Sequence, residues 1–265
     1  MIEPFRKAFA ERGIGKRGVS MVFVIAGISI VVVAALVVFF TSEDVQIGRR
    51  ISSTQVESVR EYIEDCVEDR VKEEVKSLKA YGGENGPGVP SSSFSYNGNP
   101  YNVLLESNDR NNLPSRDDVK NMIASDVRNY LTSGGCSLES FKDNFLITER
   151  RNEIDAGAEI SDSEINVNFV YPITVERGDS KIELREFNLV IEDNLGYILQ
   201  PLVLWIINRY SANPNFDLLG YCAVEGYYCD PDNSGSGEKK IDVYNSREDY
   251  ESGNADNVFR FVVVT

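Results

Sequence analysis

Residues 165–175 read INVNFVYPITV, and this stretch decides the fold class. Apolar side chains occupy every second position: Ile165, Val167, Phe169, Tyr171, Ile173 and Val175. A period of two is typical of a strand that buries one face. Residues 177–180 (RGDS) predict a tight turn, and a returning strand follows with apolar residues at 182, 184, 187, 189 and 191. The phase of that strand changes by one residue near Arg185 and Glu186, which predicts a β-bulge.

Amphipathic helices are predicted on both sides of this hairpin. The first follows the capping-box spacing of Thr54 and Glu57, carries apolar residues every three or four positions, and ends at residues 81–83. The second begins at Ser115, with Asp118 at the capping-box position, and ends at residues 134–135. A third is capped by Asp193 and contains Pro201, which should kink it or split it in two.

The remaining sequence supplies a loop and two further strands. Residues 82–100 are rich in Gly, Pro, Ser and Asn, which predicts a loop, and strands are expected near 240–244 and 258–264. The expected fold class is therefore α+β, with about three helices packed on an antiparallel sheet. We expect residues 42–81 to form an amphipathic stalk helix and residues 82–265 to form the α+β ectodomain.

A long apolar stretch precedes this domain. Residues 19–40 read VSMVFVIAGISIVVVAALVVFF, which is 22 residues without a charge. A helix of this length measures about 33 Å, and the hydrocarbon core of a bilayer is about 30 Å thick. The sequence therefore predicts a transmembrane helix over residues 19–41, with the lipid bilayer as a partner.

Flanking charges predict the orientation of this helix. Lys16 and Arg17 stand directly before it, and Glu43 and Asp44 follow it. The positive-inside rule then places residues 1–18 in the cytoplasm and residues 42–265 outside the cell. No small-x-small cleavage site follows the apolar stretch, so we expect it to be retained as the anchor of a single-pass protein of the cell membrane.

The residues before the apolar stretch allow a second interpretation. Lys16, Arg17 and Gly18 followed by apolar residues resemble the processing site of type IV prepilins, which a dedicated peptidase cuts after the glycine. Cleavage after Gly18 would leave Val19 as the N-terminus, so these two residues are a candidate processing site. The sequence departs from the pilin pattern at Phe23, because pilins usually carry Glu at the fifth mature position.

Composition argues against several classes of function. The chain has 42 acidic and 27 basic residues, a net charge of −15, and no His. An acidic surface repels nucleic acid, so no nucleic-acid partner is expected. The lack of His excludes a Ser-His-Asp site within the chain and removes a common zinc ligand. Phosphate-binding glycine loops, nucleophile elbows and C-x-x-C motifs are also missing, so we expect no catalytic residues, metal or cofactor.

The chain contains four cysteines, Cys66, Cys136, Cys222 and Cys229. An even number in an extracytoplasmic domain favours two disulfides. Cys222 and Cys229 flank a short loop and suit a local bridge, which leaves Cys66 to pair with Cys136. Two alternatives are free thiols and a zinc site of four thiolates, although no C-x2-4-C spacing supports the zinc site.

Several short motifs occur in an order that resembles a known family. These are the apolar run after Gly18, the segment VESVREYIEDC at 56–66, the helix opening at Pro114 and Ser115, and the segment FVYPI at 169–173. This order is similar to uncharacterised, membrane-anchored surface proteins of small-genome (DPANN-type) archaea. The resemblance implies an archaeal envelope protein with a Cys66–Cys136 link, and it implies no activity.

These observations lead to three hypotheses about function. We expect a non-enzymatic cell-surface ectodomain with an envelope or interaction role, which binds a protein partner or associates with itself. The first alternative is a type IV pilin-like filament subunit, and an N-terminus at Val19 would distinguish it. The second is a carboxylate-dependent surface hydrolase, which predicts a cleft with two Asp or Glu side chains about 5–10 Å apart.

Overall fold

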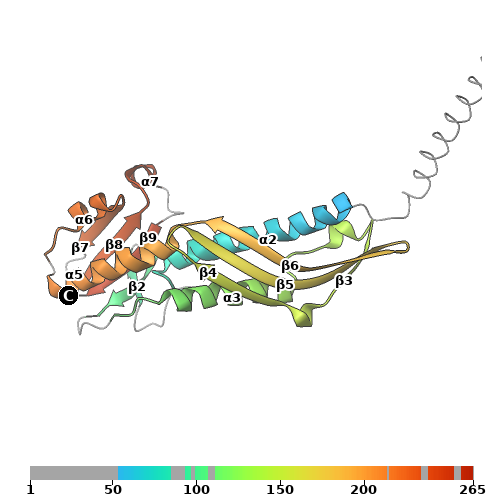
Figure 1. Ribbon diagram of the computed structural model, residues 1–265. Helices are drawn as coiled ribbons and strands as arrows, with labels where there is room; N and C mark the ends of the chain where they lie inside the picture. Colours follow the sequence, from blue (N-terminus) through green and yellow to red (C-terminus); the bar gives the residue numbers. More distant parts are fainter. Residues whose placement is uncertain are drawn as a thin grey trace, which may run out of the picture. The chain divides into compact units, whose positions relative to one another are not determined.

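The computed structural model describes residues 53–84, 93–96, 99–106, 111–213, 215–233, 238–253 and 258–264 (Figure 1). The cytoplasmic segment, the transmembrane helix over 19–41 and the processing site at Gly18 and Val19, all expected from the sequence, lie outside these residues. The chain divides into two compact units, and residues 52–176 with 181–265 form the larger one, described below. Within the described ranges, no helix combines the length and the apolar character that crossing a bilayer requires.

The larger unit contains helices, short helical turns and nine strands among its described residues. The helices are α2 (Ser53–Ala80), α3 (Arg116–Ser133), α4 (Leu195–Tyr197), α5 (Leu204–Ala212), α6 (Leu218–Val224) and α7 (Arg247–Ser252). The strands are β1 (Ser93–Tyr96), β2 (Asn99–Leu105), β3 (Leu146–Glu149), β4 (Asp155–Ile160), β5 (Glu164–Arg177), β6 (Ser180–Glu192), β7 (Tyr228–Asn233), β8 (Glu238–Tyr244) and β9 (Val258–Val264). Two 3₁₀ turns occupy Glu139–Phe141 and Arg151–Glu153. The α+β fold class is therefore confirmed.

Helix α2 is 28 residues long and buries one face completely. Its valines and isoleucine at 59, 63, 67 and 71 are 0% exposed, as the helical spacing predicted. The helix begins at Ser53, so Thr54 lies inside it rather than at its N-cap. At about 1.5 Å per residue, α2 is about 42 Å long.

Helix α3 begins and ends where the sequence predicted. Ser115 is its N-cap and forms a capping box with Asp118, and Gly134 ends it in the left-handed conformation with φ 86°. Both α2 and α3 lie on one side of strands β4, β5 and β6 (Figure 1). They cover the face that carries the buried alternate residues of β5.

The first sheet is antiparallel and is organised around β5. Strands β3 and β4 pair with its two halves along one edge, and β6 pairs with it along the other. The hairpin of β5 and β6 is the one that the alternation at 165–175 predicted. The predicted change of phase in β6 is present in its burial, because Leu184 and Phe187 are buried and both residues between them are exposed.

The second sheet is mixed, and it corrects the expectation of a purely antiparallel sheet. Its strand order is β1-β2-β9-β8-β7, and β2 runs parallel to β9. The loop expected over 82–100 was wrong in part, because β1 and the start of β2 fall within it. Strand β7 contains Pro231 and lies at the edge of this sheet, where a missing N–H breaks no ladder.

The helix predicted after Asp193 is split, as the position of Pro201 predicted. Helix α4 leads into a π-helical segment, Ile198–Val203, in which Gln200 has non-helical dihedral angles. Helix α5 then continues to Ala212. Asp193 accepts a hydrogen bond from the backbone N–H of Leu195 at 2.7 Å, although the N-cap position itself is Asn194.

The end of α2 packs directly against the second sheet. Gly82 and Gly83 have φ values of 65° and 91°, which end the helix in the left-handed region. A Cβ atom on Gly82 would lie 2.9 Å from the backbone oxygen of Arg260 on β9. This close approach places the second sheet at the end of α2 opposite Ser53.

Candidate interaction surface and cleft

The structure contains both disulfides that the sequence predicted. Cys66 of α2 is bonded to Cys136, with Cα atoms 6.0 Å apart, and Cys222 of α6 is bonded to Cys229 of β7, with Cα atoms 5.9 Å apart. None of the four cysteines is free, so they form neither the four-thiolate zinc site nor free thiols. The processing site at Gly18 and Val19 lies outside the described residues.

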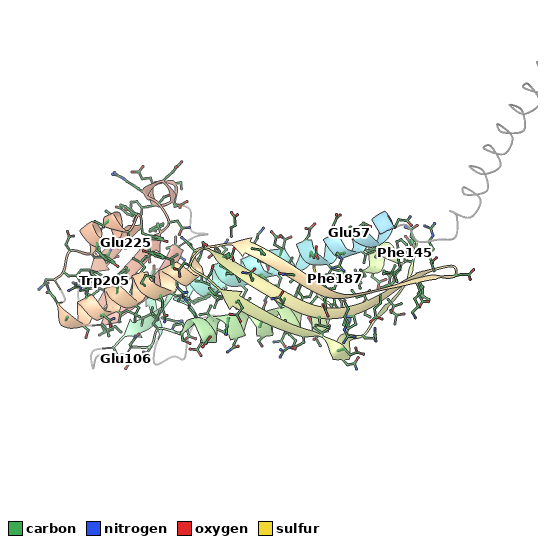
Figure 2. The ribbon with its side chains drawn as sticks, in the orientation of Figure 1. Glu57, Glu106, Phe145, Phe187, Trp205 and Glu225 are labelled. Carbon is green, nitrogen blue, oxygen red and sulfur yellow. A yellow bond between two sulfur atoms is a disulfide. The ribbon has the colours of Figure 1, made fainter. Side chains whose placement is uncertain are left out.

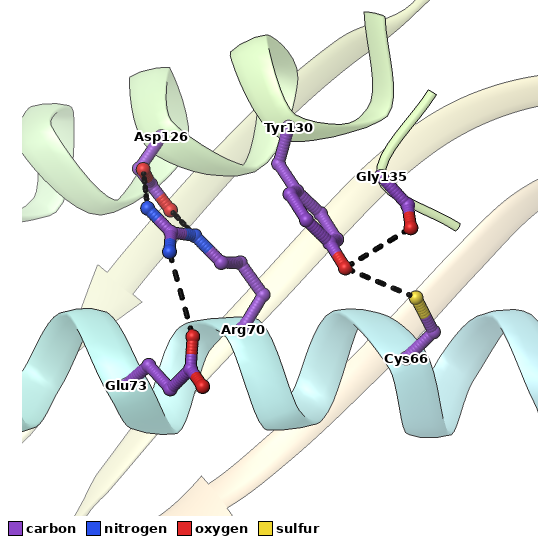
Figure 3. A network of polar contacts seen from close by, with 6 residues as sticks. All are labelled: Cys66, Arg70, Glu73, Asp126, Tyr130 and Gly135. Carbon is purple, nitrogen blue, oxygen red and sulfur yellow. Dashed lines mark hydrogen bonds and ion pairs between the residues drawn. The ribbon is translucent and has the colours of Figure 1, made fainter. Parts of the chain in front are cut away.

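The Cys66–Cys136 bridge reinforces a polar seam between α2 and α3 (Figure 3). The hydroxyl of Tyr130 donates to the carbonyl of Gly135 at 3.2 Å and lies 3.6 Å from Cys66 Sγ. Arg70 lies over the Tyr130 ring, with its guanidinium carbon 5.6 Å from the ring centroid. The seam is thus structural, since its groups bind one another across the two helices.

The Cys222–Cys229 bridge belongs to a different part of the unit, which we call the C-terminal lobe: residues 204–264, with α5, α6 and strands β7–β9. The only tryptophan of the chain, Trp205 on α5, stacks on Tyr221 of α6 with ring centroids 3.4 Å apart. Phe216 meets the Trp205 ring edge-on at 5.7 Å. Arg209 lies over the same ring at 4.8 Å.

An apolar side chain on α6 extends this aromatic surface into solvent. Val224 is 83% exposed and follows Tyr221 by three residues, so the two lie on neighbouring faces of α6, whereas Leu219, 52% exposed, lies on the other side of the helix. Trp, Tyr and Arg are the residues most enriched at the energetically important centres of protein interfaces. Exposed apolar residues beside such rings are typical of a binding surface. We call Trp205, Arg209, Tyr221 and Val224 the aromatic patch.

A second pair of rings joins the lobe to the helix that precedes it. Tyr197 of α4 and Tyr227 stack with centroids 5.7 Å apart. The Tyr197 hydroxyl donates to the Glu225 carboxylate, and this hydrogen bond raises the pKa of Tyr197 to about 12. Figure 2 shows Glu225 and Trp205 in the lobe. The Tyr197 hydroxyl is therefore a neutral donor at physiological pH, whereas the Tyr227 hydroxyl accepts a hydrogen bond from the Asn194 side-chain amide at 3.2 Å.

A third aromatic group lies on β7, β8 and α7. Tyr250 stacks on Tyr228 at 4.4 Å and meets Tyr244 edge-on at 5.3 Å. Sequence reasoning missed all three groups, although a signal was present: residues 197–250 contain Tyr197, Tyr210, Tyr221, Tyr227, Tyr228, Tyr244 and Tyr250, seven of the 13 tyrosines. Six of these seven tyrosines and the single tryptophan belong to the lobe.

A separate cleft of about 640 Å³ lies between α2 and strands β4, β5 and β6. It is lined by Arg60, Glu64, Asp155, Ala156, Gly157, Asn168, Phe169, Val170, Glu186, Phe187 and Asn188. Arg60 Nη1 donates to the backbone carbonyl of Glu186 at 3.0 Å, and its guanidinium lies 4.9 Å from the centroid of the Phe187 ring. Figure 2 labels Phe187 on β6.

Three acidic residues, Glu64, Asp155 and Glu186, line this cleft. The hydrolase hypothesis predicted a cleft that holds two such carboxylates about 5–10 Å apart. Glu64 pairs with Arg60 at 3.5 Å, and Asp155 pairs with Arg128 of α3. Asp155 is 70% exposed, and Glu186 is also exposed. A general acid in a hydrolase needs a raised pKa, which usually comes from burial. Asp155 and Glu186 therefore lack the burial that a general acid uses.

The buried carboxylates of the unit lie elsewhere. Burial and the charge of Asp126 raise the pKa of Glu74 to about 6. Burial also raises the pKa of Asp242, which accepts a hydrogen bond from the Tyr101 hydroxyl at 3.4 Å. Neither residue lines the cleft. Among the residues that the structure describes, no three acidic or cysteine side chains are placed to hold a metal ion.

Comparisons with known proteins give no family. The chain matches no protein-family model, and neither a curated protein nor a solved structure is similar to it.

Proposed function

We propose that this chain is a non-enzymatic, single-pass, membrane-anchored cell-surface protein whose disulfide-bonded ectodomain has an envelope or interaction role. The observation that carries the proposal is the pairing of all four cysteines in two disulfides. Structural disulfides persist in oxidising, extracytoplasmic surroundings and are rare in the cytosol. The uncharged segment at 19–40 supplies the anchor, and the cations before it favour an outward domain.

The aromatic patch supports the interaction role. Its rings are held by α5 and by the disulfide-closed α6, so the side chains are rigid before a partner arrives. Rigid aromatic side chains lose little conformational entropy on binding. The lobe also packs at the C-terminal end of α2, which is the end further along the chain from residues 19–41. We therefore assign partner binding to the aromatic patch.

Two measurements on intact cells test the anchored topology. With a tag at each end of the chain, an added protease should remove the C-terminal tag and spare the N-terminal one. In acid-quenched, denatured cells, a maleimide should label the cysteines only after reduction. Thiols that label without reduction would place the domain in a reducing compartment and refute the proposal. The mass of the N-terminal peptide separates the anchored protein from the pilin-like alternative, which begins at Val19.

Site-specific photo-crosslinking tests the aromatic patch. A photoreactive phenylalanine analogue at Val224 should give one discrete adduct on intact cells. The matched control is Leu146 on β3, which is 65% exposed and lies outside the lobe. The same adduct from Leu146, or none from the patch, would remove the interaction role from this surface.

A further inference from the structure

The last turn of α2 brings an amine, a carboxylate and a carboxamide together. Lys79 is 1% exposed, and its Nζ donates to Asp193 Oδ2 at 2.7 Å and to Asn194 Oδ1 at 3.4 Å. Asp193 and Asn194 follow β6 and lie 114 and 115 residues further along the chain. A lysine is almost never fully buried without a charged partner, and Asp193 is that partner. The ion pair alone does not account for the neighbouring carboxamide.

The carboxamide of Asn194 is held in one orientation. Its Nδ2 donates to the Tyr227 hydroxyl at 3.2 Å and to Asn245 Oδ1 at 3.0 Å. Both amide hydrogens are therefore engaged, and Oδ1 is turned toward Lys79. Two groups that are held about 3–3.5 Å apart react much faster than the same groups free in solution. The amine of Lys79 thus rests against the carbonyl group that it would attack.

Asp193 is placed for the proton transfers that such an attack needs. An ammonium ion has no free electron pair, so Nζ of Lys79 must first lose a proton, and Asp193 Oδ2 lies 2.7 Å away to accept it. Nζ then bonds to Asn194 Cγ, the Cγ–Nδ2 bond breaks, and its electron pair leaves with the nitrogen. Two protons pass from Nζ through Asp193 to that nitrogen, which departs as ammonium and leaves Asp193 as a carboxylate.

The surroundings of these groups suit the reaction. Lys79 and Asp193 line a cleft of about 290 Å³ whose apolar wall is formed by Val75 and Ile191. At a site with little water, a neutral amine and a neutral acid cost less to desolvate than an ion pair does. The cleft also gives the leaving nitrogen a path to solvent, so its release requires no opening of the fold.

We propose that Lys79 and Asn194 become joined by an intramolecular isopeptide bond, with Asp193 as the group that moves the protons. The bond links the end of α2 to the segment that leads from β6 into α4. Unlike the two disulfides, it is not broken by a reductant. The proposal rests on contacts outside the aromatic patch and holds whether or not that surface binds a partner.

Mass spectrometry of the full-length chain, after prolonged incubation of the folded protein, tests the proposal. The loss of ammonia should place the intact mass about 17 Da below the mass calculated for its N-terminus and two disulfides. A succinimide at an asparagine also loses ammonia, so peptide mapping must locate the bond. After reduction, trypsin should fail to cut after Lys79, and peptide 77–110 should be joined to peptide 186–209.

Variants assign a role to each of the three groups. Lys79→Arg keeps a cation beside Asp193 but removes the nucleophile, and Asn194→Ala removes the carboxamide, so neither variant should contain the linked peptide. Asp193→Ala should lower the yield of linked peptide by about tenfold or more, since the proton acceptor is lost. The matched control is Lys72→Arg on the same helix, because Lys72 is 55% exposed and pairs with Glu68; its yield should equal that of the unsubstituted chain.

Three results would overturn the proposal: normal cleavage after Lys79 in a chain of the calculated mass, a loss of ammonia without the linked peptide, or a linked peptide lighter by about 18 Da, which would place the bond on the Asp193 carboxylate. An undiminished yield in Asp193→Ala would remove the proton-transfer role from that residue. Near-ultraviolet circular dichroism establishes that each variant is folded. If a variant fails to fold, the linked peptide of the unsubstituted chain and its Lys72→Arg control still decide the question.

Discussion

Arg70 of α2 and Asp126 of α3 form a two-pronged ion pair, with Nε 2.7 Å from Oδ2 and Nη2 2.5 Å from Oδ1 (Figure 3). The pair raises the pKa of Arg70 above its ordinary value, chiefly through the hydrogen bond to Asp126. Glu74 lies one turn further along α2 and is only 4% exposed, and its Oε1 has no hydrogen-bond partner. The charge of Asp126 is therefore satisfied, and that of Glu74 is not.

Substitution of Glu74 should stabilise the protein at neutral pH. Burial, followed by the charge of Asp126, raises the pKa of Glu74 to about 6, so the folded state disfavours the ionised form. The stabilisation that comes from the neutral carboxyl is complete below a pH of about 4.5 and is lost as the pH rises through about 6. Glu74→Gln should raise the free energy of unfolding at pH 7.5 by roughly 1–2 kcal/mol.

Urea denaturation at pH 4.5 and at pH 7.5 measures this effect. The gain from Glu74→Gln should be small at the lower pH and larger at the higher one. The control is Glu73→Gln, whose carboxylate is 74% exposed and should change stability by no more than about 0.5 kcal/mol. A gain that is independent of pH would contradict the assignment to ionisation.

Removing the cation of the Lys79–Asp193 ion pair should lower the stability of the protein by a large amount. Lys79 is 1% exposed, and its Nζ lies 2.7 Å from Asp193 Oδ2. Lys79→Met would leave the carboxylate without its cation, which costs about 3–5 kcal/mol in buried pairs. Chemical denaturation measures this loss in the free energy of unfolding. Lys72→Met is the matched control, because Lys72 is 55% exposed and its pair with Glu68 lies on the surface; its effect should stay below about 1 kcal/mol.

The two disulfides should contribute unequally. Cys66–Cys136 spans 70 residues and Cys222–Cys229 spans 7. In the chain-entropy treatment these loops correspond to about 4 and about 2–3 kcal/mol. Replacing each pair by serine, and comparing the denaturation midpoints, should rank Cys66–Cys136 as the larger contributor. The opposite ranking would show that native-state contacts in the lobe outweigh loop closure.

Trp205 should report on the lobe alone. It is the only tryptophan and stacks on Tyr221, the residue before Cys222. Loss of the Cys222–Cys229 bridge should loosen that stack, shift the fluorescence to longer wavelength and increase quenching by acrylamide. Under native conditions, serine at Cys66 and Cys136 should leave the emission unchanged. Equal shifts in both variants would indicate that the lobe unfolds together with the polar seam between α2 and α3.

The sequence predicted the elements whose side chains follow a regular period. Helix α3 has both a capping box and a terminal glycine, and β5 alternates over eleven residues. Strand β1 follows a Gly- and Pro-rich stretch, and β7 contains Asp230-Pro231-Asp232, so composition argued against both. Their strand form comes from pairing with neighbours, which no local pattern contains.

The aromatic patch and the cleft were not predicted, because each combines elements that lie apart in the sequence. Arg60 and Glu186 meet although 126 residues separate them. Trp205 and Tyr221 belong to different helices, and the broken helix before Trp205 sets their approach. The cysteine pairing could be predicted because only four thiols compete, whereas surface contacts among many polar residues offer no such restriction.

The place of β9 in the second sheet has a consequence for biogenesis. Residues 258–264 are inserted between β2 and β8, which are made about 150 and 15 residues earlier. The growing polypeptide must therefore keep one edge of β2 open until residues 258–264 have been synthesised. During that interval an unpaired hydrophobic edge is exposed, so correct folding requires β9 to reach this edge before it pairs with another strand or another chain.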